Sequence, residues 1–240
     1  GISSHAGVEH ARSLGIPVIV TDHHLPGDTL PAAEPIINPN LRDCNFPSNS
    51  LAGVGVAFYL MLALRTFLRD QGWFYERGIA IPNLAELLDL VALGTVADVV
   101  PLDANNRILT WQGMSRIRAG KCRPGIKALL EVANRDPQKL AASDLGFALG
   151  PRLNAAGRLD DMSVGVALLL CDNIGEARVL ANELDALNQT RKEIEQGMQV
   201  EALTLCEKLE RSRDTLPGGL AMYHPEWHQG VVGILASRIK

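Results

Sequence analysis

The feature that most constrains the fold is a short apolar run that leads directly into an acid and two histidines. Residues 16–20 (Ile-Pro-Val-Ile-Val) are followed by Thr21, Asp22, His23 and His24. A run of this length, rich in β-branched residues and bounded by turn residues, predicts a buried parallel strand. Ligands of open α/β sheets bind at the carboxyl ends of such strands. The sequence therefore predicts a site that contains this acid and these imidazoles.

The two histidines are adjacent in the chain, which limits how they can act together. Neighbouring side chains on an extended strand point to opposite faces. His23 and His24 therefore reach one site only if the strand ends before them and the backbone bends. This favours two different roles over two ligands of one metal. The alternative is a polar turn whose imidazoles lie on the surface.

Composition limits the class of protein. The 240 residues, 47% hydrophobic and 21% charged, suit one large or two smaller soluble globular domains. The net charge of −4 means that any contact with nucleic acid must come from a local basic patch. Cys44, Cys122, Cys171 and Cys206 form no C-x-x-C pair, which argues against zinc and disulfides and predicts a cytoplasmic protein. We expect no membrane association, because no apolar run is long enough to span a bilayer.

Local patterns predict an alternation of helices and short strands. Turn and cap residues separate these segments, and a one-sided apolar stripe runs through the longest predicted helix. We expect helices over residues 6–14, 51–68, 83–93, 173–211 and 234–239, and strands over 16–20, 35–37 and 220–223. The helix over 51–68 is apolar nearly all round, so we expect it to be buried against the sheet.

A second acid lies within the apolar stretch Ala-Leu-Gly-Thr-Val-Ala-Asp-Val-Val-Pro-Leu at residues 92–102. We expect Gly94 to break the preceding helix and Asp98 to be buried among apolar neighbours. Buried carboxylates are rare unless they are paired or bound to metal. Asp98 is therefore a candidate metal ligand, and the alternative is that it caps the following segment.

Two further stretches suit phosphate binding. Residues 105–130 contain no acid but hold Trp111 and six cations, which could neutralise phosphates or form a solvated helix face. Residues 150–160 (GPRLNAAGRLD) combine small residues, which let a backbone approach a ligand, with guanidinium groups that match phosphate oxygens. They could equally form a tight helix–turn junction. The candidate phosphate-binding residues are Arg116, Arg118, Lys121, Arg123, Arg152, Asn154 and Arg158.

Several stretches resemble one family, in the order in which that family has them. Asp-His-His at 22–24 and ALGTVADVVPL at 92–102 resemble the DHH phosphoesterase superfamily, and GPRLNAAGRLD resembles its RecJ-type branch of single-strand-specific exonucleases. The resemblance implies an α/β fold with a DHH-type parallel sheet flanked by helices over 1–172. It also implies a connecting helix over 173–212 and the start of a second α/β domain, the DHH-associated domain, over 213–240.

The resemblance also implies a mechanism. Members of the superfamily hydrolyse phosphodiesters or pyrophosphate with two divalent cations, and Mn²⁺ or Mg²⁺ suits such a site. By resemblance, His23 and Asp98 would bind one metal, Asp22 would orient the imidazoles and His24 would contact the scissile phosphate. The implied activity is that of a 5′→3′ exonuclease acting on single-stranded DNA in repair and recombination. Single-strand-binding protein or a helicase are the implied protein partners.

The chain lacks some parts of the family pattern. It begins with Gly1 and ends at Lys240 within a predicted helix, so we expect an internal segment of a longer protein. The family's other aspartate motifs and its glycine-rich motif would lie outside this segment. We therefore expect an incomplete two-metal site and little or no activity of the chain alone. Three alternatives stay open: a phosphodiesterase of short oligonucleotides or small nucleotides, an inactive DNA-binding scaffold, and a plain α/β domain with coincidental motifs.

Overall fold

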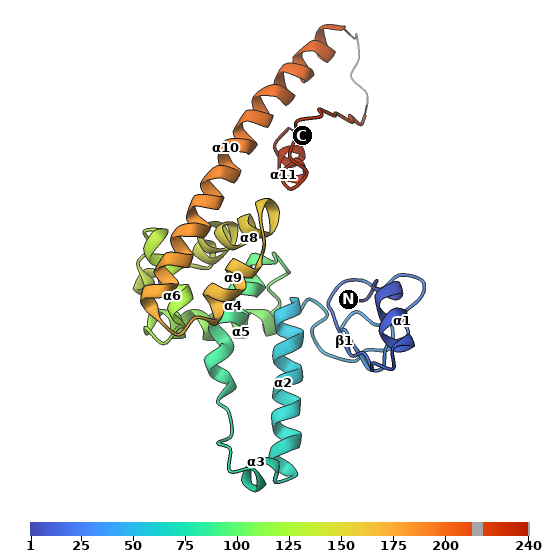
Figure 1. Cartoon of the computed structure of the whole chain (residues 1–240), viewed down its shortest axis with the longest axis vertical. Coiled ribbons are helices and arrows are strands. Elements are labelled where there is room, and N and C mark those ends of the chain that lie inside the picture. Colours follow the sequence, from blue (N-terminus) through green and yellow to red (C-terminus); the bar gives the residue numbers. More distant parts are fainter. Residues whose placement is uncertain (213–217, 240) are drawn as a thin grey trace. The chain divides into compact units, whose positions relative to one another are not determined.

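The computed structural model describes residues 1–212 and 218–239, and it divides into two compact units (Figure 1). The first unit contains residues 1–123 and 135–150, and the second contains residues 124–134 and 151–240. The start of the predicted third segment, residues 213–217, lies outside the described residues. Among the described helices, none combines the length and the apolar character that a membrane span requires.

The sheet of the first unit is parallel but small. It consists of β1 (Val20–Thr21) and β2 (Ile36–Ile37), with Val20 opposite Ile36, and α1 (His5–Ser13) precedes it. The predicted α/β class is confirmed, but the strand predicted over 16–20 is wrong in length. The N–H of Ile16 donates to Ala11 at the end of α1, and a proline follows, so neither residue can donate to a ladder.

Helices form most of the first unit. The structure places α2 at Gly53–Asp70, α3 at Trp73–Glu76, the 3₁₀-helix η1 at Leu84–Leu87, α4 at Leu88–Ala97 and α5 at Ala104–Arg118. The 3₁₀-helix η2 (Pro137–Lys139), α7 (Ala142–Asp144) and the π-helix η3 (Leu145–Leu149) follow in residues 135–150. Leu51, Val56, Phe58, Val91 and Leu109 form a buried cluster between α2, α4 and α5. This core lies between helices, and a smaller buried cluster of Val8, Val20 and Ala33 packs on the sheet.

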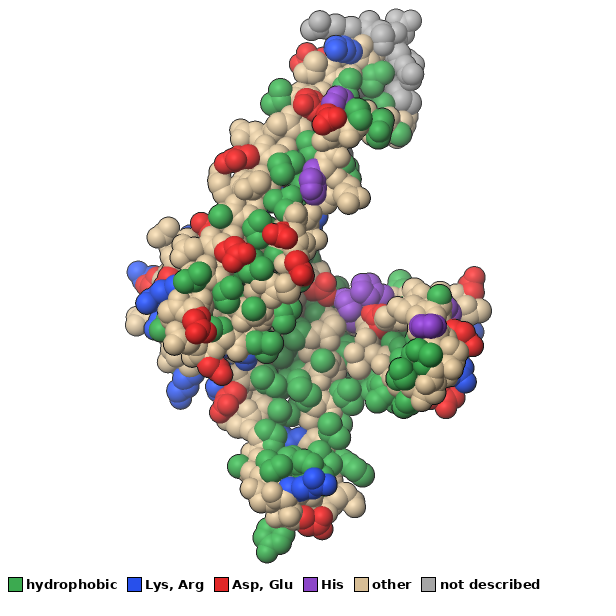
Figure 2. Space-filling model, viewed as in Figure 1, with side chains coloured by type: hydrophobic (Ala, Val, Ile, Leu, Met, Phe, Trp, Pro, Cys, Tyr) green, Lys and Arg blue, Asp and Glu red, His purple; other side chains and the backbone are tan. Residues whose placement is uncertain are grey.

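The prediction that α2 is buried against the sheet is wrong for its second half. Val56 and Phe58 are buried, but Met61, Leu64 and Phe67 are 37%, 50% and 61% exposed. A sheet of two short strands cannot cover an 18-residue helix. Figure 2 shows hydrophobic side chains gathered over this exposed part of α2 and over α3.

Gly94 lies inside α4 and does not break it, contrary to the prediction. A Cβ at Gly94 would lie 2.7 Å from Cγ1 of Val54, so the glycine allows α2 and α4 to pack closely. Asp98 directly follows α4 and its side chain is 39% exposed, so the prediction of a buried Asp98 is also wrong. The buried acid of this helix is Asp89, which is 1% exposed and pairs with Arg123.

The second unit is built on one long helix. The structure places α6 at Pro124–Val132, α8 at Gly150–Leu159, α9 at Ser163–Leu170, α10 at Ile174–Ser212 and α11 at Val232–Ile239. The predicted long helix is thus confirmed: α10 packs against α6, α9 and α11 (Figure 1). Asn173 caps it, because its Oδ1 accepts the N–H groups of Gly175 and Glu176 at 2.7 and 3.1 Å. The strand predicted over 220–223 does not form, and these residues are irregular.

Candidate metal and phosphate site

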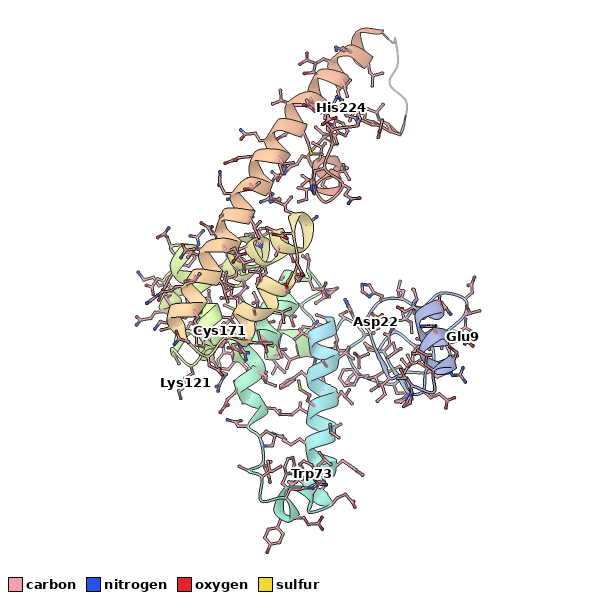
Figure 3. All side chains as sticks on the ribbon, viewed as in Figure 1. Glu9, Asp22, Trp73, Lys121, Cys171 and His224 are labelled. Atoms are coloured by element: carbon pink, nitrogen blue, oxygen red, sulfur yellow. The ribbon has the colours of Figure 1, made fainter. Side chains whose placement is uncertain are left out.

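The chain bends at the Asp-His-His motif, as the adjacent histidines require. β1 ends at Thr21, and the rings of His23 and His24 lie 4.4 Å apart between centroids, tilted by 47°. Both imidazoles therefore lie on one side of the strand end. They belong to the loop that contains Asp22, which is labelled in Figure 3. Ligand atoms of Asp22, His23 and His24 lie within 4.8 Å of one another. The loop therefore gathers one carboxylate and two imidazoles at one point.

Asp22 holds the loop in place and orients His24. Its Oδ1 accepts the N–H groups of His23 and His24 at 2.7 and 3.0 Å and lies 2.6 Å from Nδ1 of His24. Its Oδ2 accepts the N–H of Ile2 at 2.5 Å. Burial alone would raise the pKa of Asp22, but hydrogen bonds from Ile2 and from the backbone and ring of His24 hold the pKa well below its usual range. Asp22 is therefore a carboxylate whose oxygens are already used by the loop.

His23 and Asp98 face each other across the site. Nε2 of His23 lies 3.4 Å from Oδ2 of Asp98, and the two side chains are 17% and 39% exposed. Two ligand atoms of one cation, each bound at about 2.0–2.2 Å, lie roughly 3.0–3.5 Å apart. This separation, and the mixed nitrogen and oxygen donors, fit a shared Mn²⁺ or Mg²⁺ ion.

Helix packing brings these two residues together. The ring of His23 lies against Gly53 at the start of α2, where a Cβ would be 3.6 Å from Cδ2 of the imidazole. The next residue, Val54, packs onto Gly94 of α4, one turn before Asp98. The close crossing of α2 and α4 therefore sets the distance between the imidazole and the carboxylate.

Two asparagines that the sequence reasoning missed support the loop. The Nδ2 group of Asn38 donates to the carbonyl of His24 at 2.8 Å, and that of Asn40 donates to the carbonyl of His23 at 2.6 Å. Both follow β2, and the carboxyl ends of neighbouring parallel strands meet at one edge of a sheet. Polar residues after the second strand were the signal that could have identified them.

Residues 105–130 form the basic segment, and some of its cations are already bonded within the protein. Arg123 donates to buried Asp89, so the expectation of six cations without a counter-charge is wrong. Arg118 donates to the carbonyl of Leu140, at 2.5 Å from Nη2, whereas Lys121 is exposed (Figure 3). The acid that neutralises Arg123 lies 34 residues earlier in the chain, outside the acid-free stretch over residues 105–130.

Arg123 also lies away from Asp98. It contacts the start of α4 through Asp89, and Asp98 follows the end of this helix. Nine residues of helix span roughly 13 Å. Arg123 is therefore separated from the candidate metal site by nearly the length of α4.

The three candidate phosphate-binding residues of the GPRLNAAGRLD stretch lie on α8 in the second unit. Nε of Arg152 lies 2.8 Å from Oδ1 of Asp185, and Nη1 of Arg158 donates to the carbonyl of Gly230 at 2.9 Å. Asn154 is exposed. The stretch is helical over its first ten residues, so the tight helix–turn junction is confined to its end.

Comparison with known proteins identifies the family. Residues 1–95 match the model of the DHH family, N-terminal domain. All 240 residues align at 98% identity with the single-stranded-DNA-specific exonuclease RecJ of Escherichia coli (strain K12), of which they cover 42%. The chain belongs to the RecJ group of the DHH family. The predicted family is confirmed, and this RecJ-type chain spans about two fifths of the length of that curated relative.

Solved structures of RecJ match the fold. A crystal structure of exonuclease RecJ bound to manganese matches the whole chain with a TM-score of 0.78 at 36% identity, over 56% of that structure's chain. RecJ of Thermus thermophilus in complex with Mg²⁺ matches 94% of this RecJ-type chain with a TM-score of 0.70 at 34% identity, over 31% of its own chain.

Proposed function

We propose that the intact protein is a metal-dependent exonuclease that hydrolyses phosphodiester bonds of single-stranded DNA from the 5′ end, in DNA repair and recombination. The observation that carries this proposal is the facing pair of His23 and Asp98, beside a His24 whose ring is held by Asp22. The manganese and magnesium complexes among the matching structures support Mn²⁺ or Mg²⁺ as the cation. The name of the 98% identical relative supports single-stranded DNA as the substrate.

Each side chain of the candidate site has a different proposed role. His23 and Asp98 would hold a divalent cation, which would supply an activated water and charge stabilisation for phosphodiester hydrolysis. Asp22 fixes the Nδ1 side of His24, so the doubly protonated ring would donate from Nδ1 to this carboxylate and from Nε2 to the scissile phosphate. Three of these four residues lie in the loop after β1, and Asp98 directly follows α4.

Contacts to the DNA backbone are also part of the proposal. We assign phosphate contacts to Arg152, Asn154 and Arg158 on α8. A second set of contacts, which would follow the incoming strand, is assigned to Arg116, Arg118, Lys121 and Arg123. The division into a DHH domain over 1–172, a connecting helix over 173–212 and a DHH-associated domain from 213 belongs to this proposal. The proposal also includes a cytoplasmic location and a single-strand-binding protein or helicase as partner. We expect the isolated chain to be inactive.

The test is hydrolysis of single-stranded DNA labelled at either end, by the intact protein and by this chain alone, over a series of Mn²⁺ concentrations. Asp98→Ala is expected to raise the Mn²⁺ concentration needed for half-maximal rate by at least about tenfold. His24→Ala is expected to lower the rate at saturating Mn²⁺ by about 10²-fold or more. His10→Ala, an exposed histidine on α1, is the matched control and is expected to behave as wild type.

Several outcomes would contradict the proposal. Full rates of both site variants at limiting Mn²⁺ would show that the residues are wrongly assigned. Preferential hydrolysis of dinucleotides over long strands would favour a phosphodiesterase of small nucleotides. DNA binding without hydrolysis by the intact protein would favour the scaffold function.

A further inference from the structure

Phe147 is an exposed aromatic residue in an otherwise buried π-helix. In η3, Leu145, Ala148 and Leu149 are 0%, 5% and 0% exposed, whereas Phe147 is 86% exposed. Burying a phenylalanine ring contributes strongly to folding, so a ring left in solvent contributes little to this core. π-Helices are rare and occur frequently at functional sites. The packing of η3 therefore leaves the ring of Phe147 without a structural role in the described residues.

Two glycines fix η3 against the end of α4. A Cβ at Gly146 would lie 3.3 Å from Cγ1 of Val96, and a Cβ at Gly150 would lie 3.3 Å from Cβ of Ala97. Val96 and Ala97 are the last two residues of α4, and Asp98 follows them directly. Phe147 thus projects from an element that is packed against the residues next to a candidate metal ligand.

The backbone after Asp98 is unusual. Val99 has a φ of 60° and is 85% exposed. A β-branched residue in the left-handed region is strained, and such strain persists where the surroundings impose it, often beside functional sites. A second apolar side chain is therefore presented to solvent immediately after Asp98.

We propose that Phe147 is a stacking platform for a base of single-stranded DNA beside the metal site. This inference rests on the proposed function and names how that site would hold its substrate. Every base has a π-face, so stacking on an aromatic ring gives affinity without sequence preference. An exonuclease that degrades any sequence needs contacts of this kind, because hydrogen bonds to base edges would discriminate between bases.

The experiment measures binding of the intact protein to single-stranded oligonucleotides by fluorescence anisotropy, with EDTA present to prevent hydrolysis. Phe147→Ala is expected to weaken binding by about five- to 150-fold. Phe147→Trp is expected to retain affinity, whereas Phe147→Leu, which keeps an apolar side chain without a π-face, is expected to behave like alanine. Tyr75→Ala removes a ring that is 92% exposed on α3 and is expected to have no effect.

Oligonucleotides with one abasic position separate stacking from a general loss of affinity. Wild type is expected to lose affinity when the abasic position coincides with the platform, and Phe147→Ala is expected to show no further loss there. Unchanged binding by Phe147→Ala would overturn the proposal. A marked drop in the melting temperature of intact Phe147→Ala would also overturn it, because the ring would then be packed against another part of the protein.

The same experiment separates this inference from the proposed function. If wild type neither binds nor hydrolyses single-stranded DNA, the exonuclease proposal and the stacking platform are both refuted. If wild type does both and the Phe147 variants match it, the exonuclease proposal stands and only the platform is refuted.

Discussion

Replacing Gly113 with alanine tests whether α4 and α5 are packed as closely as the structure indicates. A Cβ at Gly113 would lie 2.0 Å from the carbonyl oxygen of Leu88 and 2.5 Å from Cβ of Ala92. Real Cβ atoms essentially never approach another atom within 3.0 Å, so α5 must move away from α4 by about 1 Å. The first of these contacts is backbone, which cannot move aside as a flexible side chain can.

The separation can be converted into a free energy. A buried leucine-sized side chain makes about 40–60 contacts of 0.1–0.2 kcal/mol, and a gap of 0.5–1 Å loses about a quarter or more of that energy. Each side chain of this size between the helices then loses about 1–3 kcal/mol. Val91 and Leu109 are two buried side chains of this region. After about 1 kcal/mol gained from the better helix propensity of alanine, the expected loss of unfolding free energy is about 3 kcal/mol.

The assay is urea unfolding, monitored by hydrogen exchange of peptides from α4 and α5, so that only this part of the protein is measured. The midpoint for Gly113→Ala is expected to fall by roughly 1–3 M urea. Gly7→Ala is the matched control in the same unit, because no atom lies within 4 Å of a Cβ at Gly7, and it is expected to leave these peptides unchanged. A midpoint for Gly113→Ala equal to or above that of wild type would refute the packing argument.

Three further outcomes follow from the first unit. Gly94→Ala is expected to cost about 1–2 kcal/mol in urea unfolding, and no cost is expected in a Val54→Ala background, because the clash is with that side chain. Asp89→Asn is expected to cost about 3–5 kcal/mol, since it breaks a buried ion pair with Arg123; a loss below about 1 kcal/mol would contradict this. Asp103→Ala is expected to cost about 1 kcal/mol at pH 7. A capped backbone N–H of α5 and a serine hydroxyl lower the pKa of Asp103, so this cost is expected to shrink as the pH falls below the ordinary value of 3.8.

Local patterns were sufficient to predict the elements whose causes are local. The bend at the Asp-His-His motif follows from the alternation of side chains on a strand, and the structure ends β1 at Thr21. The long helix follows from its apolar stripe and the Asn173 cap, and it forms over 39 residues. These features depend on residues within a few positions of one another, which a sequence displays directly.

Burial of the acids could not be predicted, because it depends on residues far away in the chain. Asp98 lies among apolar residues in the sequence, but the helix ends there and Val99 turns outward, so the carboxylate meets solvent. Asp89 is buried because it pairs with Arg123, which lies 34 residues later in the chain. In the same way, Gly94 looked like a helix breaker because its packing partner, Val54, lies 40 residues earlier.

The position of Asp98 is therefore set by the helix that precedes it rather than by contacts of its own. α4 is packed closely against α2 at Gly94, against α5 at Gly113 and against η3 at Gly146. A helix held on several sides is a rigid support, and sites built on rigid elements keep their geometry to within about half an ångström. The carboxylate is then both exposed to solvent and fixed relative to His23. If these two residues hold the cation as proposed, substitutions that separate the helices should weaken metal binding without touching a ligand, since they move the end of α4 away from the histidine.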